Sequence, residues 1–479
     1  MPSDEEILNY IYAKQLEIEN LKKSKLKNID KRRFKFEKLK EHVDNFIDSD
    51  DEYYSRLIVM PGLRGIGKTI LLYQLHDYLL NEKSINRNDI FYLDVNDLML
   101  AYNSNIKEVI DTFIEQIHHT TISALDHKIF LLIDEAHLDD DWASYSRLLF
   151  DKSNNIFIIL TGSSALKLNQ NTDATRRITI EELLPCNFRE YILLNYGINL
   201  KTDFLRQMII KADKKSIEKS IECEKEIHEM TLQMGNALDL ELKKYIYTKS
   251  YPFALNNDEF ESYRYINNTI DRVIRDDLQD FKHFNSITTT KISQLISFLA
   301  TKRPGSTSKQ VLSQALNLDV KTITKIFEVL EQSGLIFSIH AYGSSGKMLK
   351  KKTEHFFSTP SIKSALNNRI KRYDLNDIQC YSVLLENMVA STIHGISIDL
   401  LSPVGLFYDA EKRGVDFIIK LEDKTIPLEV GIGNKTKSQL IRSMNKYNAQ
   451  LGILVSNRTS RIKYENNILY IPVSTFALI

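Results

Sequence analysis

Cysteine, glycine and proline are all scarce in this chain, whose 479 residues include 3 Cys, 16 Gly and 9 Pro. The cysteines, Cys186, Cys223 and Cys380, lie far apart, and none belongs to a C-x-x-C pair. Their spacing speaks against a zinc site and against a disulfide framework, and it fits a reducing compartment. The low glycine and proline contents exclude collagen-like and proline-rich chains.

Long apolar runs are also missing. None approaches the roughly 18 residues that a membrane-spanning helix needs, and the longest, Lys128–Asp134, has the length of a strand. The chain begins with the acidic sequence Met1–Glu6 and lacks the basic and apolar regions of a signal peptide. We therefore expect a cytoplasmic protein without a membrane partner.

The chain has no net charge, because 63 Lys and Arg balance 63 Asp and Glu. That balance excludes a uniformly basic nucleic-acid binder but not a local one. Residues 22–40 hold 10 basic and 2 acidic residues, a local charge of +8, whereas residues 41–52 hold 6 acidic and no basic ones. Apolar spacing predicts a charged helix over 5–40 and an acidic linker, together residues 1–52. This segment is either a solvated helix or an arm that binds DNA or a partner.

Short apolar strands alternate with helices over residues 53–200. Strands are predicted at 56–60, 89–94, 129–133 and 156–160, and helices near 68–80 and 105–125. Continuous apolar strands are typical of a sheet buried on both faces, and parallel strands need helical crossovers. The predicted fold class is therefore α/β, with a doubly wound parallel sheet.

The remaining residues divide into three predicted parts. Residues 201–287 are mostly polar and helical, as expected of a lid. Residues 288–345 show the pattern of a winged helix, with helices near 291–302, 308–316 and 319–333 followed by a strand. The lysine-rich stretch 347–352 is a wing or a linker, and residues 346–479 form a final α/β domain.

A phosphate-binding loop stands between the first strand and the first helix of the core. Residues 62–69 match G-x-x-x-x-G-K-[ST] at every fixed position. The glycines let backbone N–H groups turn toward a phosphate at the N-terminus of a helix, where the dipole favours an anion. Lys68 is predicted to reach the β- and γ-phosphates of ATP, and Thr69 to bind Mg²⁺. The predicted nucleotide contacts are Gly62, Arg64, Gly65, Gly67, Lys68, Thr69 and Ile70.

A second motif follows where the apolar strand 129–133 ends in Asp134 and Glu135. Asp134 is predicted to hold Mg²⁺ through water. Glu135 is the predicted catalytic residue that polarises the attacking water, which distinguishes ATPases with an additional strand from Ras-like GTPases. The strand predicted at 90–94 lies between the two motifs, as that class requires.

Hydroxyl groups and arginines follow the next strand. Thr161, Ser163 and Ser164 are each suited to sense the γ-phosphate, and the sequence does not decide which of them does so. Ser163 is the residue of this set that we name as a catalytic candidate. Arg176 and Arg177 come 12 and 13 residues after Ser164. Arg177 is a candidate for stabilising transition-state charge, in its own subunit or in a neighbouring one of a homo-oligomer. The alternative is ordinary surface charge.

These motifs resemble those of prokaryotic AAA-type P-loop ATPases, related to STAND and archaeal ATPases. Members of that group carry a winged helix and a C-terminal restriction-endonuclease-like domain of unknown function. The resemblance covers residues 53–479 and extends to Leu184–Tyr191, Arg272–Leu278, Leu385–Asn387 and Gly414–Ile419. The chain departs from the group at Arg176-Arg177, where the group has Gly-Arg, and at Lys249–Pro252, where it has Gly-Gly-Tyr-Pro.

A C-terminal strand pair carries acidic residues that suit this resemblance. If Leu421 pairs with Lys424, Asp416 lies opposite Glu429 across the hairpin. Two facing carboxylates can bind Mg²⁺, as in PD-(D/E)xK nucleases. Glu386, on a preceding helix, resembles the third acid of that fold.

The lysine of the nuclease motif is absent from its usual place. It should stand two residues after Glu429, where this chain has Gly431, and Lys435 is a candidate replacement from the following loop. An active nuclease site and a catalytically dead PD-(D/E)xK-like fold both stay open.

Lys321 and Lys325 lie on the predicted recognition helix and suit phosphate contacts without base readout. The leading hypothesis is an ATP-hydrolysing switch that uses ATP and Mg²⁺ and acts on or near double-stranded DNA through its winged helix and nuclease-like domain. The alternatives are an ATP-gated, Mg²⁺-dependent DNA nuclease and a STAND-like signalling module with little turnover that recruits protein partners.

Overall fold

The computed structural model describes residues 2–27, 29, 31–48, 55–163, 177–277, 286–304, 308–371, 378–399, 404–411, 413–431 and 437–479. The chain forms two compact units, Met1–Leu183 and Leu184–Ile479, here called the first and the second unit. Among the described residues, no helix combines the length and the apolarity needed to cross a membrane.

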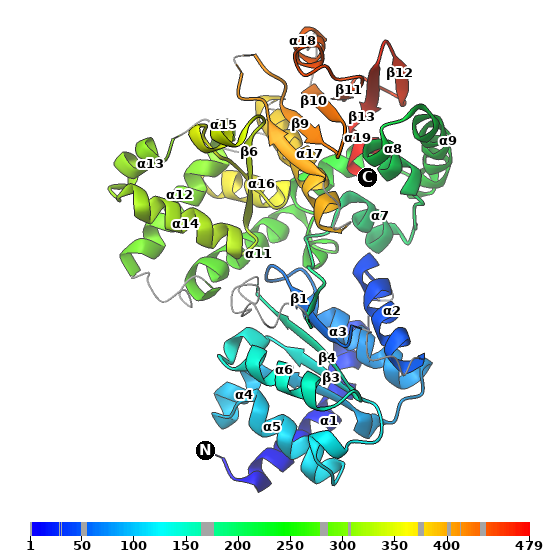
Figure 1. Ribbon diagram of the computed structural model, residues 1–479, viewed down its shortest axis with the longest axis vertical. Coiled ribbons are helices and arrows are strands. Elements are labelled where there is room, and N and C mark those ends of the chain that lie inside the picture. Colours follow the sequence, from blue (N-terminus) through cyan, green and yellow to red (C-terminus); the bar gives the residue numbers. More distant parts are fainter. Residues whose placement is uncertain are drawn as a thin grey trace. The chain divides into compact units, whose positions relative to one another are not determined.

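The first unit is built on a five-stranded parallel sheet in the order β2-β3-β4-β1-β5. Figure 1 shows β4 of this sheet between β1 and β3. Its strands are β1 (Leu57–Pro61), β2 (Ile90–Asp94), β3 (Ile129–Asp134), β4 (Ile156–Gly162) and β5 (Thr179–Ile180). Apolar side chains point to both faces of the sheet, so both faces need a cover. The four strands predicted from sequence are confirmed within one or two residues, and so is the parallel α/β fold.

Helices cover both faces of this sheet. α5 (Ile106–Thr112) and α6 (Trp142–Lys152) share one core with Leu131 and Ile158. On the other face, Phe46 of α2 (Phe34–Asp48) packs against Phe130 and Phe157, next to α3 (Lys68–Asp77). α4 (Val95–Tyr102) follows β2. The doubly wound arrangement is thereby confirmed.

The N-terminal segment differs from its prediction. In place of one helix over 5–40, the structure has α1 (Asp4–Leu26) and α2, and both belong to the first unit. Their apolar sides bury against different partners: Ile7 and Ile11 join the core with α5, whereas Phe46 reaches the opposite face of the sheet. A single straight helix cannot cover both places, so the chain turns between the two.

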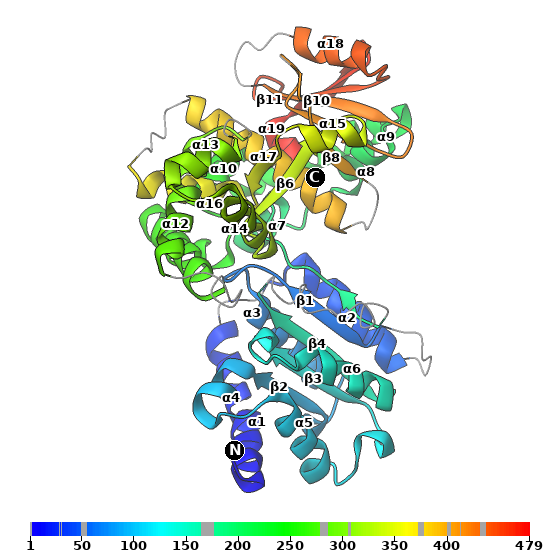
Figure 2. The same ribbon diagram turned by 60° about the vertical axis from the view of Figure 1, so that its left-hand side comes forward.

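The second unit combines helices with an eight-stranded mixed sheet, in the order β12-β13-β11-β10-β9-β8-β6-β7. Its strands are β6 (Ile336–Ala341), β7 (Glu354–Phe357), β8 (Gly405–Tyr408), β9 (Phe417–Lys420), β10 (Thr425–Gly431), β11 (Gly452–Ser456), β12 (Lys463–Glu465) and β13 (Ile468–Pro472). Its helices are α7 (Phe188–Tyr196), α8 (Asp203–Lys211), α9 (Lys214–Thr231), α10 (Leu238–Tyr247), α11 (Glu259–Arg272), α12 (Ser286–Thr301), α13 (Lys309–Leu316), α14 (Val320–Gln332), α15 (Ser345–Lys350), α16 (Pro360–Arg369), α17 (Ile378–Asp399), α18 (Ser438–Lys446) and α19 (Val473–Ala477). Figure 2 shows α17 against the sheet, where it contacts β7, β8 and β10.

The helices predicted at 291–302, 308–316 and 319–333 are present as α12, α13 and α14. They are followed by β6, which pairs antiparallel with β7 and parallel with β8, so this strand also belongs to the C-terminal sheet. The lysine-rich stretch, expected to be a wing or a linker, begins as the short helix α15. The assignment as a winged helix stays a prediction.

The C-terminal hairpin has the predicted register. Thr425 pairs with Lys420 and Leu428 with Phe417, and the N–H of Leu421 bonds the carbonyl oxygen of Lys424. This register brings Asp416, just before β9, level with Glu429 of β10. The assignment of this sheet to the PD-(D/E)xK fold stays a prediction.

Candidate functional site

The loop from Gly62 to Lys68 joins β1 to α3 at the carboxyl edge of the first unit's sheet. Gly65 and Gly67 have φ of 77° and 97°, a left-handed backbone that favours glycine. A Cβ on Gly62 would lie 2.5 Å from the carbonyl oxygen of Leu183, so only glycine fits there. The predicted nucleotide contacts Gly62, Arg64, Gly65, Gly67, Lys68, Thr69 and Ile70 thus form one continuous loop and the first turn of a helix.

The ammonium group of Lys68 is buried within this loop. Its Nζ donates to the carbonyl oxygens of Gly62, at 2.9 Å, and Leu63, at 3.0 Å. Arg33, a buried residue just before α2, donates from Nη1 to the carbonyl oxygen of Ile66 at 2.9 Å. The two cationic side chains therefore hold carbonyl oxygens of the loop on the two sides of Gly65.

Asp134 connects the loop with the neighbouring strands. Its Oδ2 accepts from the hydroxyl of Thr69 at 2.6 Å and from that of Tyr92 at 3.3 Å. Its Oδ1 accepts from the hydroxyl of Thr161. Burial and the nearby carboxylate of Glu135 raise the pKa of Asp134, whereas the hydrogen bonds from Thr161 and Thr69 and the charge of Lys68 oppose this rise. The structure thus brings Lys68, Thr69 and Asp134 together, with the oxygen ligands that Mg²⁺ prefers.

Glu135 is held in an unusual backbone conformation beside Asp134. Its φ is 53°, and its N–H points toward Asp134 Oδ1, at 3.2 Å, and Thr161 Oγ1, at 3.3 Å. The Glu135 carboxylate is 27% exposed, and its Oε2 lies 3.3 Å from Nδ1 of His137. Burial and the charges of Lys68 and Arg64 lower the pKa of His137 to about 4. A neutral imidazole therefore flanks Glu135, the candidate base. The sequence analysis did not predict His137 as part of the site, although it stands only two positions after Glu135.

The three sensor candidates fall in different positions. Thr161, at the end of β4, bonds Asp134, so its hydroxyl supports the acid. Ser163 is 2% exposed, and its hydroxyl has no hydrogen-bond partner among the residues that the structure describes. Ser164 and Arg176 lie outside the described residues. Of the two sensor candidates that the structure describes, Thr161 is the one that bonds an acid of the site.

Arg177 is not brought to this edge. It precedes β5, which runs parallel to β1, so it lies near the amino ends of the strands, whereas the loop lies at their carboxyl ends. Its Nε lies 2.7 Å from Oδ1 of Asp151, near the end of α6. The arrangement does not support action on phosphate within the same chain, and a role in a neighbouring subunit stays a prediction.

A second group of functional candidates lies in the second unit, where four carboxylates lie on neighbouring segments of the sheet and of α17. Glu386 comes from α17, Asp416 precedes β9 and Glu429 lies on β10. Glu354 of β7 was not predicted, yet burial and then the charges of Glu386 and Asp416 raise its pKa to about 7. The register that placed Asp416 beside Glu429 is confirmed, but Glu354 stands over 60 residues earlier and no motif marks it.

The surroundings of this acidic group contain one buried lysine. Oδ2 of Asp416 accepts from the N–H of Val430 at 2.7 Å, and Glu429 is 1% exposed. Lys363 of α16 is 3% exposed, and burial, opposed by the charge of Glu386, lowers its pKa to about 8. Lys435, the candidate for the missing motif lysine, lies outside the described residues. Lys363 is thus a buried lysine whose charge interacts with the carboxylate of Glu386.

Two family models match this chain. One, described as an AAA domain, matches residues 54–192, which include the loop, Asp134 and Thr161. The other, described as a domain of unknown function (DUF8612), matches residues 239–372. The first match agrees with the parallel sheet and with the loop geometry.

Relatives match over most of the chain. "Uncharacterized protein MJ1637" of Methanocaldococcus jannaschii is 33% identical over 453 residues, covering 94% of this chain and 90% of the relative. An uncharacterized protein of Haemophilus influenzae is 24% identical over 383 residues, covering 78% of this chain and 81% of the relative. Among solved structures, AMPPCP-bound DnaA from Aquifex aeolicus aligns with 14% identity and a TM-score of 0.25, covering 61% of this chain and 86% of DnaA. Given the identity with the first relative across nearly the whole of both chains, this protein belongs to the family of MJ1637, and its Gly62–Thr69 loop lies in an AAA-type P-loop domain.

Proposed function

We propose that this protein is an ATP-hydrolysing molecular switch of the AAA type. The observation that carries the proposal is the convergence of Lys68, Thr69 and Asp134 at the carboxyl edge of a parallel sheet, with Glu135 beside them. A loop with left-handed glycines at a helix N-terminus is suited to phosphate, and a buried hydroxyl–carboxylate pair is suited to Mg²⁺. These features support nucleotide binding more strongly than any other chemistry in the first unit.

Each residue has a distinct proposed role. Lys68 exchanges its two carbonyl partners for phosphate oxygens, and Thr69 and Asp134 hold the metal ion, which supplies charge neutralisation at the phosphates. Glu135, partly exposed, accepts a proton from the attacking water. The imidazole of His137, 3.3 Å from the Glu135 carboxylate, has a lowered pKa and adds no competing positive charge.

The test is a phosphate-release assay on the purified full chain, with and without Mg²⁺. We expect Mg²⁺-dependent ATP hydrolysis, and a Glu135→Gln variant that still binds nucleotide but turns over about 100-fold more slowly. Glu115→Gln is the matched control, because Glu115 is an exposed acid of the same unit. Unchanged turnover in Glu135→Gln would remove Glu135 from the mechanism. Tight nucleotide binding with no turnover in the wild type would instead favour the signalling module.

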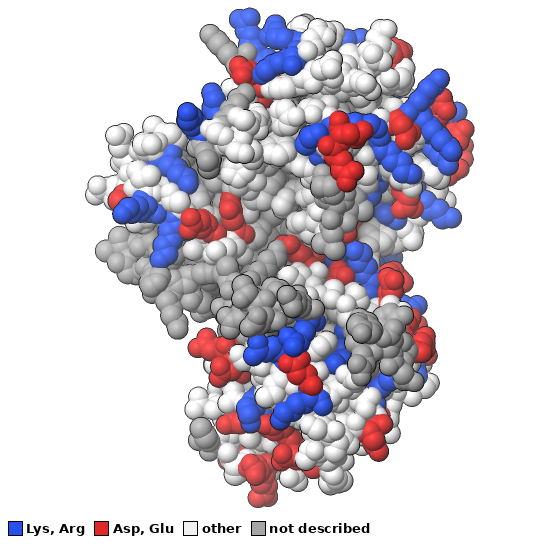
Figure 3. Space-filling view, viewed as in Figure 1, with Lys and Arg blue, Asp and Glu red and all other residues white. Residues whose placement is uncertain are grey.

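We further propose that the switch acts on DNA through its second unit. A cavity of about 400 Å³ lies between α12, α13, α14 and the segment 350–355, and six basic residues line it: Lys302, Arg303, Lys309, Lys350, Lys351 and Lys352. Figure 3 shows Lys and Arg side chains over the region of α13 and α14. Clustered cations of this kind suit phosphate contacts, which depend strongly on salt and little on base sequence.

Gel-shift and anisotropy measurements on duplex DNA at increasing salt test this proposal. Replacing Lys350, Lys351 and Lys352 by alanine should weaken binding equally for unrelated duplexes and reduce the salt slope by about 3. The control replaces the three lysines Lys214, Lys215 and Lys219 of α9. Equal losses in the two triple variants, or no binding at low salt, would contradict a DNA site at this cavity. Stimulation of ATP hydrolysis by DNA would link the two units.

The acidic group favours a second candidate function, a Mg²⁺-dependent nuclease. The observation is a fourth carboxylate, Glu354 of β7, which lies near Glu386 and Asp416; burial and then the charges of these two acids raise its pKa to about 7. The assay incubates supercoiled and linear DNA with protein and Mg²⁺ or Mn²⁺, with and without ATP. Cleavage should vanish in Asp416→Ala and persist in Asp423→Ala, an exposed acid of the same hairpin. Equal cleavage by both variants would assign any cutting to a contaminant.

A further inference from the structure

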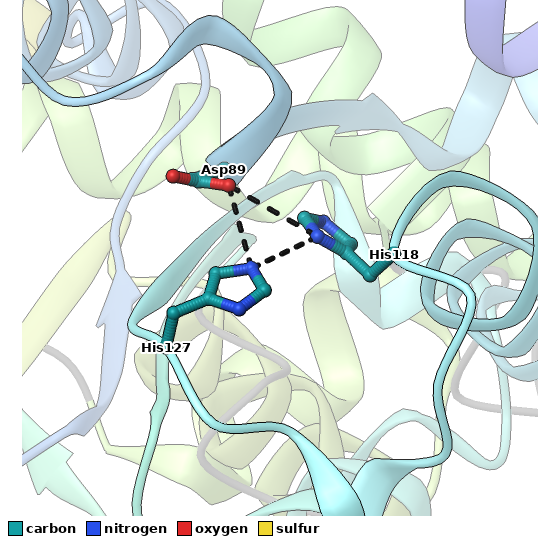
Figure 4. Close-up of side chains that lie close together, drawn as sticks. All are labelled: Asp89, His118 and His127. Carbon is teal, nitrogen blue, oxygen red and sulfur yellow. Dashed lines mark hydrogen bonds and ion pairs between the residues drawn. The ribbon is translucent and has the colours of Figure 1, made fainter.

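Two histidines and an aspartate meet in the first unit, away from the phosphate-binding loop. Nε2 of His127 lies 3.0 Å from Nδ1 of His118 and 3.5 Å from Oδ1 of Asp89, and His118 Nδ1 lies 4.0 Å from the same carboxylate oxygen. Figure 4 shows the two rings and the carboxylate turned toward one another. Three atoms that can each donate a lone pair therefore surround a common point.

The three residues come from separate segments at the amino edge of the sheet. Asp89 directly precedes β2, His127 stands two residues before β3, and His118 follows the short helical segment Phe113–Ile117 that extends α5. The strands are parallel, so this edge is opposite to the one that carries Asp134. The cluster is thus independent of the proposed nucleotide site.

The hydrogen bond of His127 prepares its ring for a cation. Nδ1 of His127 lies 2.9 Å from Oδ1 of Asp126, a distance at which the ring donates its proton to the carboxylate. With its proton on Nδ1, His127 has a lone pair on Nε2, which accepts the hydrogen bond from Nδ1 of His118 at 3.0 Å and lies 3.5 Å from the carboxylate of Asp89. A metal ion at this place replaces the proton that His118 Nδ1 donates. A carboxylate behind a histidine is the usual arrangement for metal-ligating imidazoles, because it fixes the tautomer and raises the basicity of the other nitrogen.

The size of the cluster matches a transition-metal ion. The point equidistant from the three ligand atoms lies about 2.1 Å from each, within the range of Zn²⁺–nitrogen and Zn²⁺–carboxylate distances. An ion at this point lies in the plane of its three protein ligands and is open on either side to water or an outside ligand. Ca²⁺ and Mg²⁺ prefer more oxygen ligands, so two imidazoles select against them.

The burial of the residues is also suitable. His118 is 5% exposed at its side chain and packs edge-on against Phe113, whereas His127 is 41% exposed and leaves a path for an ion.

We propose that Asp89, His118 and His127 bind a divalent transition-metal ion of the Zn²⁺ class. The bound ion joins the connection between α5 and β3 to the start of β2. The few, widely spaced cysteines exclude only a zinc site built on thiolates. Histidine and aspartate supply all three ligands here.

The test measures Zn²⁺ binding to the untagged full chain by competition with a chromophoric chelator, and checks coordination from the visible absorption of bound Co²⁺. To remove competition from the acidic group of the second unit, every protein carries Asp416→Ala and Glu429→Ala. We expect one equivalent of Zn²⁺ and a loss of affinity of about 10-fold or more in His127→Ala. His119→Ala, an exposed neighbour outside the cluster, should bind like the parent protein.

Asp89→Asn and His127→Ala keep the test independent of the buried His118, whose removal can disturb folding. Equal affinity in His127→Ala and His119→Ala, or no binding in the parent protein, would overturn the proposal and leave a hydrogen-bonded cluster that shares a proton. Zn²⁺ binding that persists in Lys68→Ala, where nucleotide binding is lost, would show that the site is separate from the proposed ATPase.

Discussion

The two candidate sites of this protein surround their acidic residues in opposite ways. At the loop edge of the first unit, Asp134 accepts hydrogen bonds from Thr69, Thr161 and Tyr92 and lies near Lys68. In the second unit, Glu354 faces the carboxylates of Glu386 and Asp416, and its pKa rises to about 7. Burial raises the pKa of both acids, but at Asp134 the hydrogen bonds from Thr161 and Thr69 and the charge of Lys68 oppose the rise, whereas at Glu354 the charges of Glu386 and Asp416 add to it. The second site is therefore electrostatically unfavourable until a proton or a cation arrives. We infer that the loop site works through the side chains placed around Asp134, whereas the acidic group needs a bound cation or a proton.

The largest effect is expected when the positioning cation of the first site is removed. Lys68→Ala should lower nucleotide affinity or turnover by about 100-fold or more, equivalent to about 3 kcal/mol, because no other described side chain replaces an ammonium group inside the loop. Fluorescent-nucleotide titration and the phosphate-release assay measure it. Lys107→Ala, on an exposed lysine of the same unit, is the control and should change neither quantity. A loss of only a few-fold would mean that nucleotide binding and turnover at this site do not depend on the charge of Lys68.

The second effect concerns the acidic group and should be a gain in stability. Glu354→Gln removes a charge that burial and two neighbouring carboxylates oppose, so the free energy of unfolding at pH 8 should rise by about 2 kcal/mol. In the wild type, Mg²⁺ should raise Tm, and in the variant this increment should shrink, because one ligand and part of the repulsion are gone. Differential scanning calorimetry measures both quantities.

Glu328→Gln on α14 is the matched control, since Glu328 is an exposed acid of the same unit, and its Tm should hardly change with or without Mg²⁺. A destabilised Glu354→Gln would show that the acidic group is balanced by contacts other than a bound cation. The acidic group would then not be electrostatically unfavourable without a cation, in contrast to what we expect.

The two sites also differ in how much of them could be predicted from sequence. The loop site follows from contiguous motifs, because a parallel sheet brings the ends of β1, β3 and β4 to one edge, and Lys68, Asp134 and Thr161 stand at those ends. The hairpin register was equally predictable, since the Leu421–Lys424 turn fixes every pair beyond it.

What could not be predicted depends on tertiary packing. Glu354 joins Glu386 only because β7 and α17 pack together, and an isolated Glu in a strand carries no sign of that contact. Likewise, the turn between α1 and α2 arises from two apolar faces that need different partners, and no glycine or proline marks it. The distance of Arg177 from the loop follows from the direction of β5, a strand of only two residues.

The smallest effect tests whether the charges next to a carboxylate, and not only its burial, set its pKa. Glu181 of the first unit is a partly buried acid with the opposite environment: its carboxylate lies 2.8 Å from Lys35 and 3.0 Å from His42, both on α2. Burial would raise the pKa of Glu181, but the hydrogen bonds from His42 and Lys35, with the charges of Lys35 and Lys38, lower it to about 2. A lowered pKa adds stability above the unfolded value of about 4.5 and loses it as the pH falls toward 2.

Glu181→Gln should therefore lower the free energy of unfolding by about 1 kcal/mol at pH 7, a figure reduced for the partial exposure of the ion pair, and the difference from the wild type should shrink as the pH falls from 4.5 to 3. Urea unfolding followed by the fluorescence of Trp142 measures this effect, because the chain has a single tryptophan and it is buried in the first unit. Glu115→Gln should show no such pH dependence. If Glu181→Gln were as stable as the wild type at pH 7, Lys35 and His42 would not offset the burial of this carboxylate, and Glu181 would no longer be the opposite case to Glu354.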